Sequence, residues 1–318
     1  MKFEQTADRA RSGGDMDTFQ GRGLVKHFPG RRVIRACDGI SLTIRQGSIL
    51  GLVGESGCGK TTVGRLLLAL MKPDRGEVLF RGMPLTRMHE KEIRPLRSHF
   101  QMIFQDSASA FNPRIRVADA LKEAIRLHRA MDARDMWMLI EEILARVNLS
   151  RGILYNFVGN LSGGETKRLD IARALCINPD YLVADEPLAL LDMSIQSQIA
   201  NLLMDVREKQ NTGILFISHD LRMVEMLSAT VAVMYRGRIM EQAAKKEIIS
   251  EPLHPYTRHL WDPASSVFFM GLKPGGCIYR NSCFLYQKKG FPLICAEQQP
   301  PLSEHRPGHL AACHFAGE

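Results

Sequence analysis

A glycine-rich loop at residues 54–61 has the residue types and spacing that bind phosphate. Its sequence, Gly-Glu-Ser-Gly-Cys-Gly-Lys-Thr, fits the pattern of Gly, four residues, Gly, Lys and Ser or Thr. In such a loop, backbone N–H groups turn inward on a phosphate, and the following helix adds its positive N-terminal dipole. We expect Lys60 to reach the outer phosphates of a nucleoside triphosphate and the Thr61 hydroxyl to bind Mg²⁺. Other candidates for nucleotide contact are Gly54, Ser56, Gly57, Cys58, Gly59 and Thr62.

The chain on both sides of this loop supports the interpretation. Residues 49–53 are short and apolar enough for a buried parallel strand, and residues 63–70 have the pattern of a helix. A glycine-rich turn that matches by chance is the alternative, and the flanking strand and helix argue against it.

Two adjacent carboxylates follow a second buried strand, which we expect at residues 181–184. Asp185 can hold Mg²⁺ directly or through water, and Glu186 can polarise the attacking water. Carboxylates at the end of a strand are often ordinary surface residues. A phosphate-binding loop elsewhere in the chain favours the functional interpretation of this pair.

Three other side chains are candidates for the same site. Gln105 ends a strand expected at 99–106 and can offer its carbonyl oxygen to Mg²⁺, although it could be a plain loop residue. His219 follows a strand expected at 213–218, at the sheet edge where open α/β folds bind ligands, so we expect it at the γ-phosphate. Phe28 could stack on an adenine ring or could be an ordinary core aromatic.

A second helix N-terminus suited to anions begins at Ser162, Gly163, Gly164 and Glu165, before a helix expected at 166–177. One nucleotide needs a single phosphate loop. The second site is explained if it faces a nucleotide held by another subunit, and an ordinary serine N-cap is the alternative.

The chain has 318 residues and a net charge of +8, with basic residues scattered through both halves. This charge is weak support for nucleic-acid or membrane binding, and we predict no nucleic-acid partner. There is no run of eighteen or more apolar residues and no apolar stretch of a secretory signal near the start. We therefore expect any membrane contact to be peripheral.

The remaining pattern predicts the organisation of the chain. We expect a flexible tail at 1–20, a nucleotide-binding domain at 21–250, a helical subdomain inserted at about 107–162 and an extension at 251–318. The core of the helical subdomain is predicted to contain Met136, Trp137, Met138, Leu139, Ile143 and Leu144. Further strands are predicted at 23–28, 40–44, 77–82, 230–235 and 238–241, and further helices at 117–130, 134–147, 194–209 and 245–250.

Four of the seven cysteines crowd the extension: Cys277, Cys283, Cys295 and Cys313. In a nucleotide-binding protein of the cytosol, this spacing favours a metal over disulfides. Four thiolates can hold tetrahedral zinc or a [4Fe–4S] cluster, and the residue types alone do not separate the two.

Taken together, the motifs resemble those of the ATP-binding cassette (ABC) family over about residues 20–250. The phosphate loop resembles Walker A, Gln105 the Q-loop, Leu161 to Glu165 the signature loop, Asp185 and Glu186 the end of Walker B, Ala189 to Asp192 the D-loop, and His219 the switch histidine. The resemblance implies an α/β P-loop NTPase core with an antiparallel β-subdomain and an inserted helical subdomain. It also implies ATP hydrolysis by two cassettes that close head to tail, so that each signature loop completes the site of the opposite subunit.

The sequence departs from the family pattern at two places. Glu165 stands where the signature motif usually has glutamine, a variant that the family tolerates. The D-loop reads Leu188-Ala189-Leu190-Leu191-Asp192 and lacks the usual threonine and serine hydroxyls. Loss of these hydroxyls favours slow hydrolysis at one composite site, and hence a heterodimer of homologous cassettes.

The segment His254-Pro255-Tyr256-Thr257 resembles that of the ATPase subunits that drive oligopeptide, dipeptide and nickel import. The resemblance implies two permease subunits, an indirect role for an extracytoplasmic solute-binding protein, and a position on the cytoplasmic face of the inner membrane. It favours a [4Fe–4S] cluster over zinc at the tail cysteines. The alternatives are soluble ABC ATPases that act in iron–sulfur assembly or on ribosomes or DNA.

Overall fold

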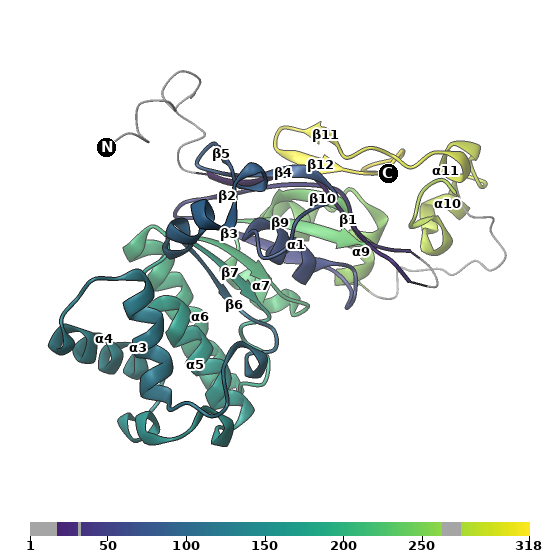
Figure 1. Ribbon diagram of the computed structural model, residues 1–318. Helices are drawn as coiled ribbons and strands as arrows, with labels where there is room; N and C mark the ends of the chain where they lie inside the picture. Colours follow the sequence, from purple (N-terminus) through teal and green to yellow (C-terminus); the bar gives the residue numbers. More distant parts are fainter. Residues whose placement is uncertain (1–17, 31–32, 263–274) are drawn as a thin grey trace.

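The computed structural model describes residues 18–30, 33–262 and 275–318, which form two sheets with helices between and around them (Figure 1). The predicted tail at 1–20 ends too late. Strand β1 (Thr18–Phe28) begins at Thr18, and the side chains of its first three residues are buried. Residues 1–17 lie outside the described residues.

The larger sheet has eight strands in the order β11-β12-β10-β9-β3-β8-β7-β6. Five neighbouring strands, β9, β3, β8, β7 and β6, pair in parallel. Their carboxyl ends therefore meet at one edge, where ligands bind in open α/β sheets. Every residue of β3, β7 and β8 is buried, in keeping with their continuous apolar runs. The strands are β3 (Ile49–Val53), β6 (Phe100–Ile103), β7 (Tyr181–Asp185), β8 (Gly213–Ile217), β9 (Thr230–Tyr235), β10 (Arg238–Ala244), β11 (Ser303–Arg306) and β12 (His309–Ala311).

A smaller antiparallel sheet packs over helix α1 (Lys60–Leu67). Its order is β2 (Ile34–Arg45), β1, β4 (Arg75–Phe80) and β5 (Met83–Pro84). The ring centroids of Phe19 in β1 and Phe100 in β6 lie 5.4 Å apart, which joins the two sheets through aromatic packing. The fold is therefore the predicted P-loop core with an antiparallel β-subdomain.

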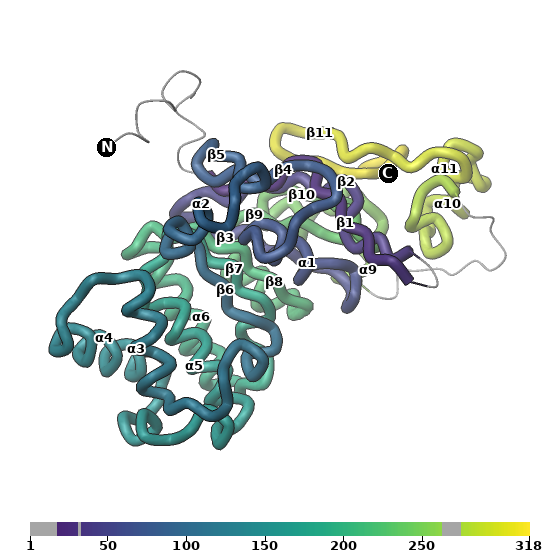
Figure 2. The backbone as a smooth tube through the Cα atoms, viewed as in Figure 1, coloured from purple at the N-terminus to yellow at the C-terminus, as the bar shows by residue number. Residues whose placement is uncertain are grey.

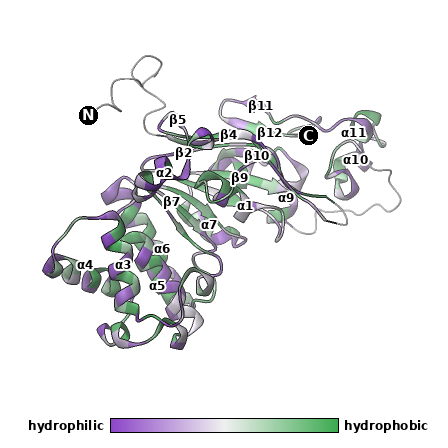
Figure 3. Cartoon of the chain, viewed as in Figure 1, coloured by the Kyte–Doolittle hydropathy of each residue, from purple (hydrophilic) through white to green (hydrophobic). Residues whose placement is uncertain are grey.

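Helices α3 (Val117–His128) and α4 (Ala133–Arg146) form a lobe to one side of the large sheet (Figure 2). Hydrophilic and hydrophobic colours alternate along both helices, as expected for amphipathic helices (Figure 3). The prediction that Trp137 and Met138 belong to the core is wrong, because their exposed fractions are 36% and 58%. Consecutive apolar residues on a helix cannot all face one side. The other helices of the core are α2 (Glu90–Ile93), α5 (Gly163–Leu175), α6 (Met193–Gln210), α7 (Leu221–Leu227) and α8 (Lys245–Ser250).

The C-terminal residues continue the large sheet. After helices α9 (Pro255–Trp261), α10 (Phe284–Lys288) and α11 (Leu293–Glu297), strand β12 pairs antiparallel with β10. His309 in β12 and Glu241 in β10 are fully buried, and His309 Nε2 lies 2.6 Å from Glu241 Oε1. The extension is thus anchored by strand pairing and a buried polar contact.

In the part of the chain that the structure describes, no helix is both long enough and apolar enough to cross a membrane.

Candidate functional site

The phosphate loop connects the end of β3 to α1 in a conformation that requires glycine. Gly54 and Gly59 have φ angles of 152° and 113°. A Cβ atom would lie 2.0 Å from the carbonyl oxygen of Met234 at Gly54, and 2.0 Å from that of Ala36 at Gly59. The loop is therefore held between β9 and β2, and neither glycine can be replaced without moving backbone.

Lys60 lies inside the curve of this loop. Its side chain is buried, and its Nζ donates hydrogen bonds to the carbonyl oxygens of Gly54 at 2.6 Å and Glu55 at 3.0 Å. The ammonium group is thus positioned at the centre of the loop by the loop itself. This is where the loop would hold a phosphate.

A cavity of about 310 Å³ opens beside the loop. Its wall brings together residues from β1, β2, the phosphate loop and the ends of β6 and β7. These residues are Phe28, Ile34, Ala36, Ser56, Gly57, Gly59, Lys60, Thr61, Thr62, Gln105, Asp185 and Glu186. Ten of the predicted site residues therefore meet at one cavity, although they come from four separate parts of the sequence.

Asp185 supplies a buried carboxylate at this cavity. Its exposed fraction is 1%, and neither carboxylate oxygen has a hydrogen-bond partner within standard distance among the described residues. Burial raises the pKa of Asp185, and the nearby Thr61 hydroxyl opposes that shift. The Thr61 hydroxyl donates to Gln105 Oε1 at 3.4 Å. The three side chains offer the oxygen ligands that Mg²⁺ prefers, and an unpaired buried carboxylate fits a cation.

Glu186 and His219 form a pair at the edge of the cavity. His219 Nδ1 lies 2.8 Å from Glu186 Oε1, and the side chains are 68% and 12% exposed, respectively. Glu186 has a φ angle of 47°, and its backbone N–H donates to Ile217 at 2.9 Å. This turn fixes the carboxylate at the sheet edge, where His219 can orient it.

Known proteins share this combination of sequence and fold. The ABC transporter family matches residues 37–189. The oligopeptide transport ATP-binding protein AppF of Bacillus subtilis is 38% identical over 92% of this chain and 96% of its own length. The chain belongs to the ABC transporter family. It is an ATP-binding and ATP-hydrolysing subunit of such a transporter.

Solved structures show the same fold. The protein cbiO1 from Clostridium perfringens, part of the ABC transporter complex cbiONQ, is 26% identical with a TM-score of 0.62, over 74% of this chain and 92% of its own. A dimeric ATP-binding cassette, MJ0796, in a post-hydrolysis state with ADP and Pi has a TM-score of 0.67 over 71% of this chain and 98% of its own, at 24% identity. At 24% identity, the similarity to MJ0796 concerns the fold alone.

The signature loop of this ABC subunit lies away from its own nucleotide cavity. Ser162 caps α5, and its backbone N–H and hydroxyl both donate to Glu165 Oε2, at 2.9 and 2.8 Å. These bonds lower the pKa of Glu165, the backbone N–H contributing most. The glutamate at this position therefore forms a capping box. Gly163 and Gly164 instead face Leu190 of the same chain's D-loop.

Four other predicted site residues also do not line the cavity, and one of them is His219, which contacts Glu186 at the cavity edge. Asp192 is the N-cap of α6 and accepts hydrogen bonds from the backbone N–H groups of Ser194 and Ile195. Cys58 is buried, and Gly54 contributes its carbonyl oxygen to Lys60. These residues shape the loops around the site.

The Q-loop backbone is held by helix α5, a feature that the sequence motifs did not indicate. Lys167 Nζ donates to the carbonyl oxygen of Phe104 at 2.6 Å, and Asp170 Oδ2 accepts from the backbone N–H of Phe104 at 2.8 Å. Lys167 and Asp170 are buried, with exposed fractions of 1% and 0%. The helix that starts at the signature loop is therefore bonded to the chain just before Gln105.

The four tail cysteines form no disulfide in the structure. Among the described residues, no group of three or more His, Cys, Asp or Glu side chains is arranged to hold a metal ion. The pKa of Cys313 is raised to about 12, mainly by burial and also by the charges of Cys283, Cys277 and Cys295, against the opposing effect of the Phe315 backbone N–H. The four thiols are thus within electrostatic range of one another.

Proposed function

We propose that this ABC subunit energises the import of peptides, or of a related solute such as nickel, through a membrane transporter. The observation that carries the proposal is its similarity to AppF, an oligopeptide transport ATP-binding protein, over 96% of that protein's length. The similarity therefore extends beyond the cassette into the extension. In this role the chain would bind no solute itself, since the permease and the solute-binding protein would select it.

The cavity supports a division of labour in hydrolysis. Lys60 and the loop N–H groups would hold the phosphates of ATP, with Phe28 against the adenine ring. Thr61, Gln105 and Asp185 would hold Mg²⁺, which when bound neutralises charge on the phosphate oxygens. Glu186 would accept the proton of the attacking water at its carboxylate, and His219 would orient that carboxylate and reach toward the γ-phosphate.

A second cassette would complete the site. Because Ser162 and the two glycines after it lie away from the cavity of their own chain, they are free to face a nucleotide on another subunit. We propose a homologous rather than identical partner, since Leu188 and Leu190 replace the hydroxyl side chains of the usual D-loop. Two transmembrane permease subunits would bind beside Gln105 and the helical subdomain, which would place this chain peripherally at the cytoplasmic face of the membrane.

Purification under mild detergent tests the transport role. The tagged chain should co-purify with a second cassette and two permease subunits, and cells that carry Lys60→Ala in its place should lose uptake of labelled oligopeptides. Recovery with ribosomes, DNA or iron–sulfur assembly proteins, and normal uptake in the Lys60→Ala strain, would contradict the proposal. Arg151→Gln, on the exposed surface of the helical lobe, is the matched control.

We further propose that Cys277, Cys283, Cys295 and Cys313 hold a [4Fe–4S] cluster, with zinc as the second choice. The support is the chemistry of the donor set: four thiols in electrostatic range, with the Phe315 N–H aimed at the Cys313 sulfur at 3.4 Å. To hold the metal, the four thiols would have to turn toward a common centre, because no ligand group is arranged among the described residues.

The ultraviolet–visible spectrum of anaerobically purified protein, with iron and zinc counted per chain, tests the metal. Four irons per chain together with visible absorption support the cluster. Cys295→Ser should remove the metal, and the buried cysteine variant Cys176→Ser should keep it. Protein that contains neither metal after anaerobic purification would contradict the proposal.

A further inference from the structure

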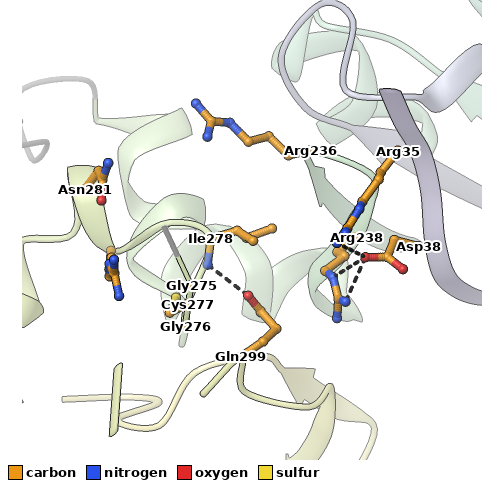
Figure 4. A pocket seen from close by; sticks show the side chains of 11 residues that line it. Arg35, Asp38, Arg236, Arg238, Gly275, Gly276, Cys277, Ile278, Asn281 and Gln299 are labelled. Carbon is orange, nitrogen blue, oxygen red and sulfur yellow. Dashed lines mark hydrogen bonds and ion pairs between the residues drawn. The ribbon is translucent and has the colours of Figure 1, made fainter. Parts of the chain in front are cut away.

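A second cavity, of about 450 Å³, lies between the β-subdomain and the C-terminal extension (Figure 4). Arg35 in β2, with Arg236 and Arg238 at the β9–β10 hairpin, forms one side of it. Arg280 and Asn281 of the extension form the other. This cavity shares no lining residue with the nucleotide cavity.

The lining of this cavity is strongly positive. Four arginines line it, and Asp38 is the one carboxylate among its described lining residues. Asp38 Oδ2 accepts from Arg238 at 2.8 Å and lies 3.9 Å from Arg35. Asp38 therefore neutralises one arginine, which leaves a net charge of about three positive units around a concave surface.

Two of these arginines are not needed to hold the fold. The Arg35 side chain is 67% exposed, and Arg236 is exposed at the tip of the hairpin. By contrast, Arg238 is paired with Asp38, and the buried Arg280 donates to the carbonyl oxygen of Ala296. To turn toward a ligand, this exposed pair would give up only the 3.9 Å contact from Arg35 to Asp38 and the stacking of Arg236 on Tyr235, at 5.2 Å from the ring centroid.

The position of Arg236 is unfavourable for its residue type. It has a φ angle of 44° in a two-residue hairpin turn, where asparagine or glycine is preferred. The turn is fixed, because the Gly237 N–H donates to Cys58 at 2.9 Å and the Gly237 carbonyl oxygen accepts from Asp38 at 2.8 Å. An arginine held in this conformation is therefore aimed from a rigid base.

We propose that this cavity binds a small soluble anion with two or more negative charges, of the phosphate-ester or pyrophosphate class. Guanidinium groups pair in bidentate fashion with phosphate oxygens, and several of them around one concavity favour a multivalent anion. The volume is in the range of about 300–1,000 Å³ that small ligands occupy, and the polar lining favours a charged ligand over an apolar one.

This site is separate from the nucleotide site although both use β2. Ile34 and Ala36 line the nucleotide cavity, and Arg35 between them lines the arginine cavity. Asp38 of the same strand also lines the arginine cavity, because the register of β2 against β1 shifts between Arg35 and Cys37 and interrupts the simple alternation of faces. A probe that contains phosphate must therefore be tested with the phosphate loop disabled.

Isothermal titration of the full-length Lys60→Ala protein with inorganic pyrophosphate tests the proposal. We expect saturable binding that weakens with added NaCl and becomes at least tenfold weaker in the same protein carrying Arg35→Gln and Arg236→Gln. The control carries Arg87→Gln and Arg151→Gln, two exposed arginines whose loss removes the same charge. This control should bind pyrophosphate like the Lys60→Ala parent.

Three results would overturn the proposal. The first is no saturable binding of pyrophosphate, and the second is equal affinity in the Arg35 and Arg236 double variant. The third is arginine-dependent binding to vesicles of anionic phospholipid without binding of pyrophosphate, which would make the cavity a lipid contact. Because the assay needs no ATP hydrolysis and no transport partner, its failure is distinct from failure of the proposed transport function.

Discussion

The hydroxyl oxygen of Tyr256 accepts a hydrogen bond from the backbone N–H of Glu55 at 3.1 Å, across 201 residues of sequence. Tyr256 is fully buried, and its ring centroid lies 4.6 Å from that of Tyr235 and 5.3 Å from that of Tyr279. Glu55 is part of the phosphate loop. The extension therefore touches the nucleotide site directly, and a rigid aromatic group holds the contact in place.

Tyr256→Phe should weaken ATP binding without unfolding the protein. The variant keeps the ring and loses the hydroxyl, so the Glu55 N–H is left without its acceptor. One such hydrogen bond contributes about 1 kcal/mol, which corresponds to a rise of about fivefold in KM for ATP. Steady-state ATPase assays over a range of ATP concentrations measure it. The control is Tyr279→Phe, which keeps the same aromatic packing and should leave the KM for ATP unchanged. Equal KM values in the wild type, Tyr256→Phe and Tyr279→Phe would contradict the role of the Tyr256 hydroxyl.

Glu186→Gln should retain ATP binding and lose turnover. The amide can still lie near the His219 ring, but it cannot accept the proton of the attacking water. A positioned general base contributes about 10²- to 10⁴-fold, so we expect a fall in kcat of this size. Nucleotide binding and ATPase rate should be measured on the same preparation. Glu208→Gln, on an exposed helix surface, is the control. Full activity of Glu186→Gln would exclude the proposed mechanism.

The buried Asp185 carboxylate should make the stability of the folded protein depend on pH and on Mg²⁺. Because burial raises its pKa in the folded state, its contribution to stability is present below its unfolded pKa and is lost as pH rises through the folded pKa. Above that folded-state pKa, the ionised, buried carboxylate opposes folding. Asp185→Asn should unfold at a higher temperature than wild type in EDTA, and the difference should shrink as the pH is lowered.

Thermal unfolding with EDTA and with Mg²⁺ checks this expectation. Mg²⁺ should stabilise the wild type more than Asp185→Asn, since the ion binds the folded carboxylate. Asp205→Asn removes an exposed carboxylate paired with Lys209, so it should not raise the unfolding temperature. An Asp185→Asn protein that is less stable than wild type in EDTA would show that the carboxylate has a partner in solution.

Local patterns predicted most of the nucleotide cavity. The phosphate loop is contiguous, and the side chains of Gln105 and Asp185 follow apolar strands, so their common sheet edge could be inferred from the topology of parallel strands. The helix after the loop begins at Lys60, earlier than its apolar residues suggested, because Gly59 serves as N-cap and the first turn carries polar residues. Periodicity locates a helix better than it locates its ends.

Contacts between distant segments could not be predicted in the same way. Pairing of β12 with β10, and the bond from Tyr256 to the phosphate loop, depend on how the extension folds back on the core. The residues around Tyr256 resemble those of a family of ATPase subunits, but nothing in them indicates that the Tyr256 hydroxyl contacts Glu55. The arginine cavity was missed for the same reason, since its arginines are scattered until the hairpin and the extension meet.

Glu165 should limit how readily two subunits close on ATP. Its carboxylate accepts both bonds from Ser162, and a partner's triphosphate would meet this negative charge at the signature loop. Glu165→Gln keeps an acceptor for the Ser162 N–H and removes the charge. A repulsion of about 1 kcal/mol corresponds to about fivefold less ATP needed for dimerisation. Light scattering during ATP titration measures it, with the Glu186→Gln chain at high concentration, so that a second copy of the chain stands in for the homologous partner cassette. Glu142→Gln on α4 controls for charge, and an unchanged ATP requirement in Glu165→Gln would mean that the signature glutamate does not face nucleotide.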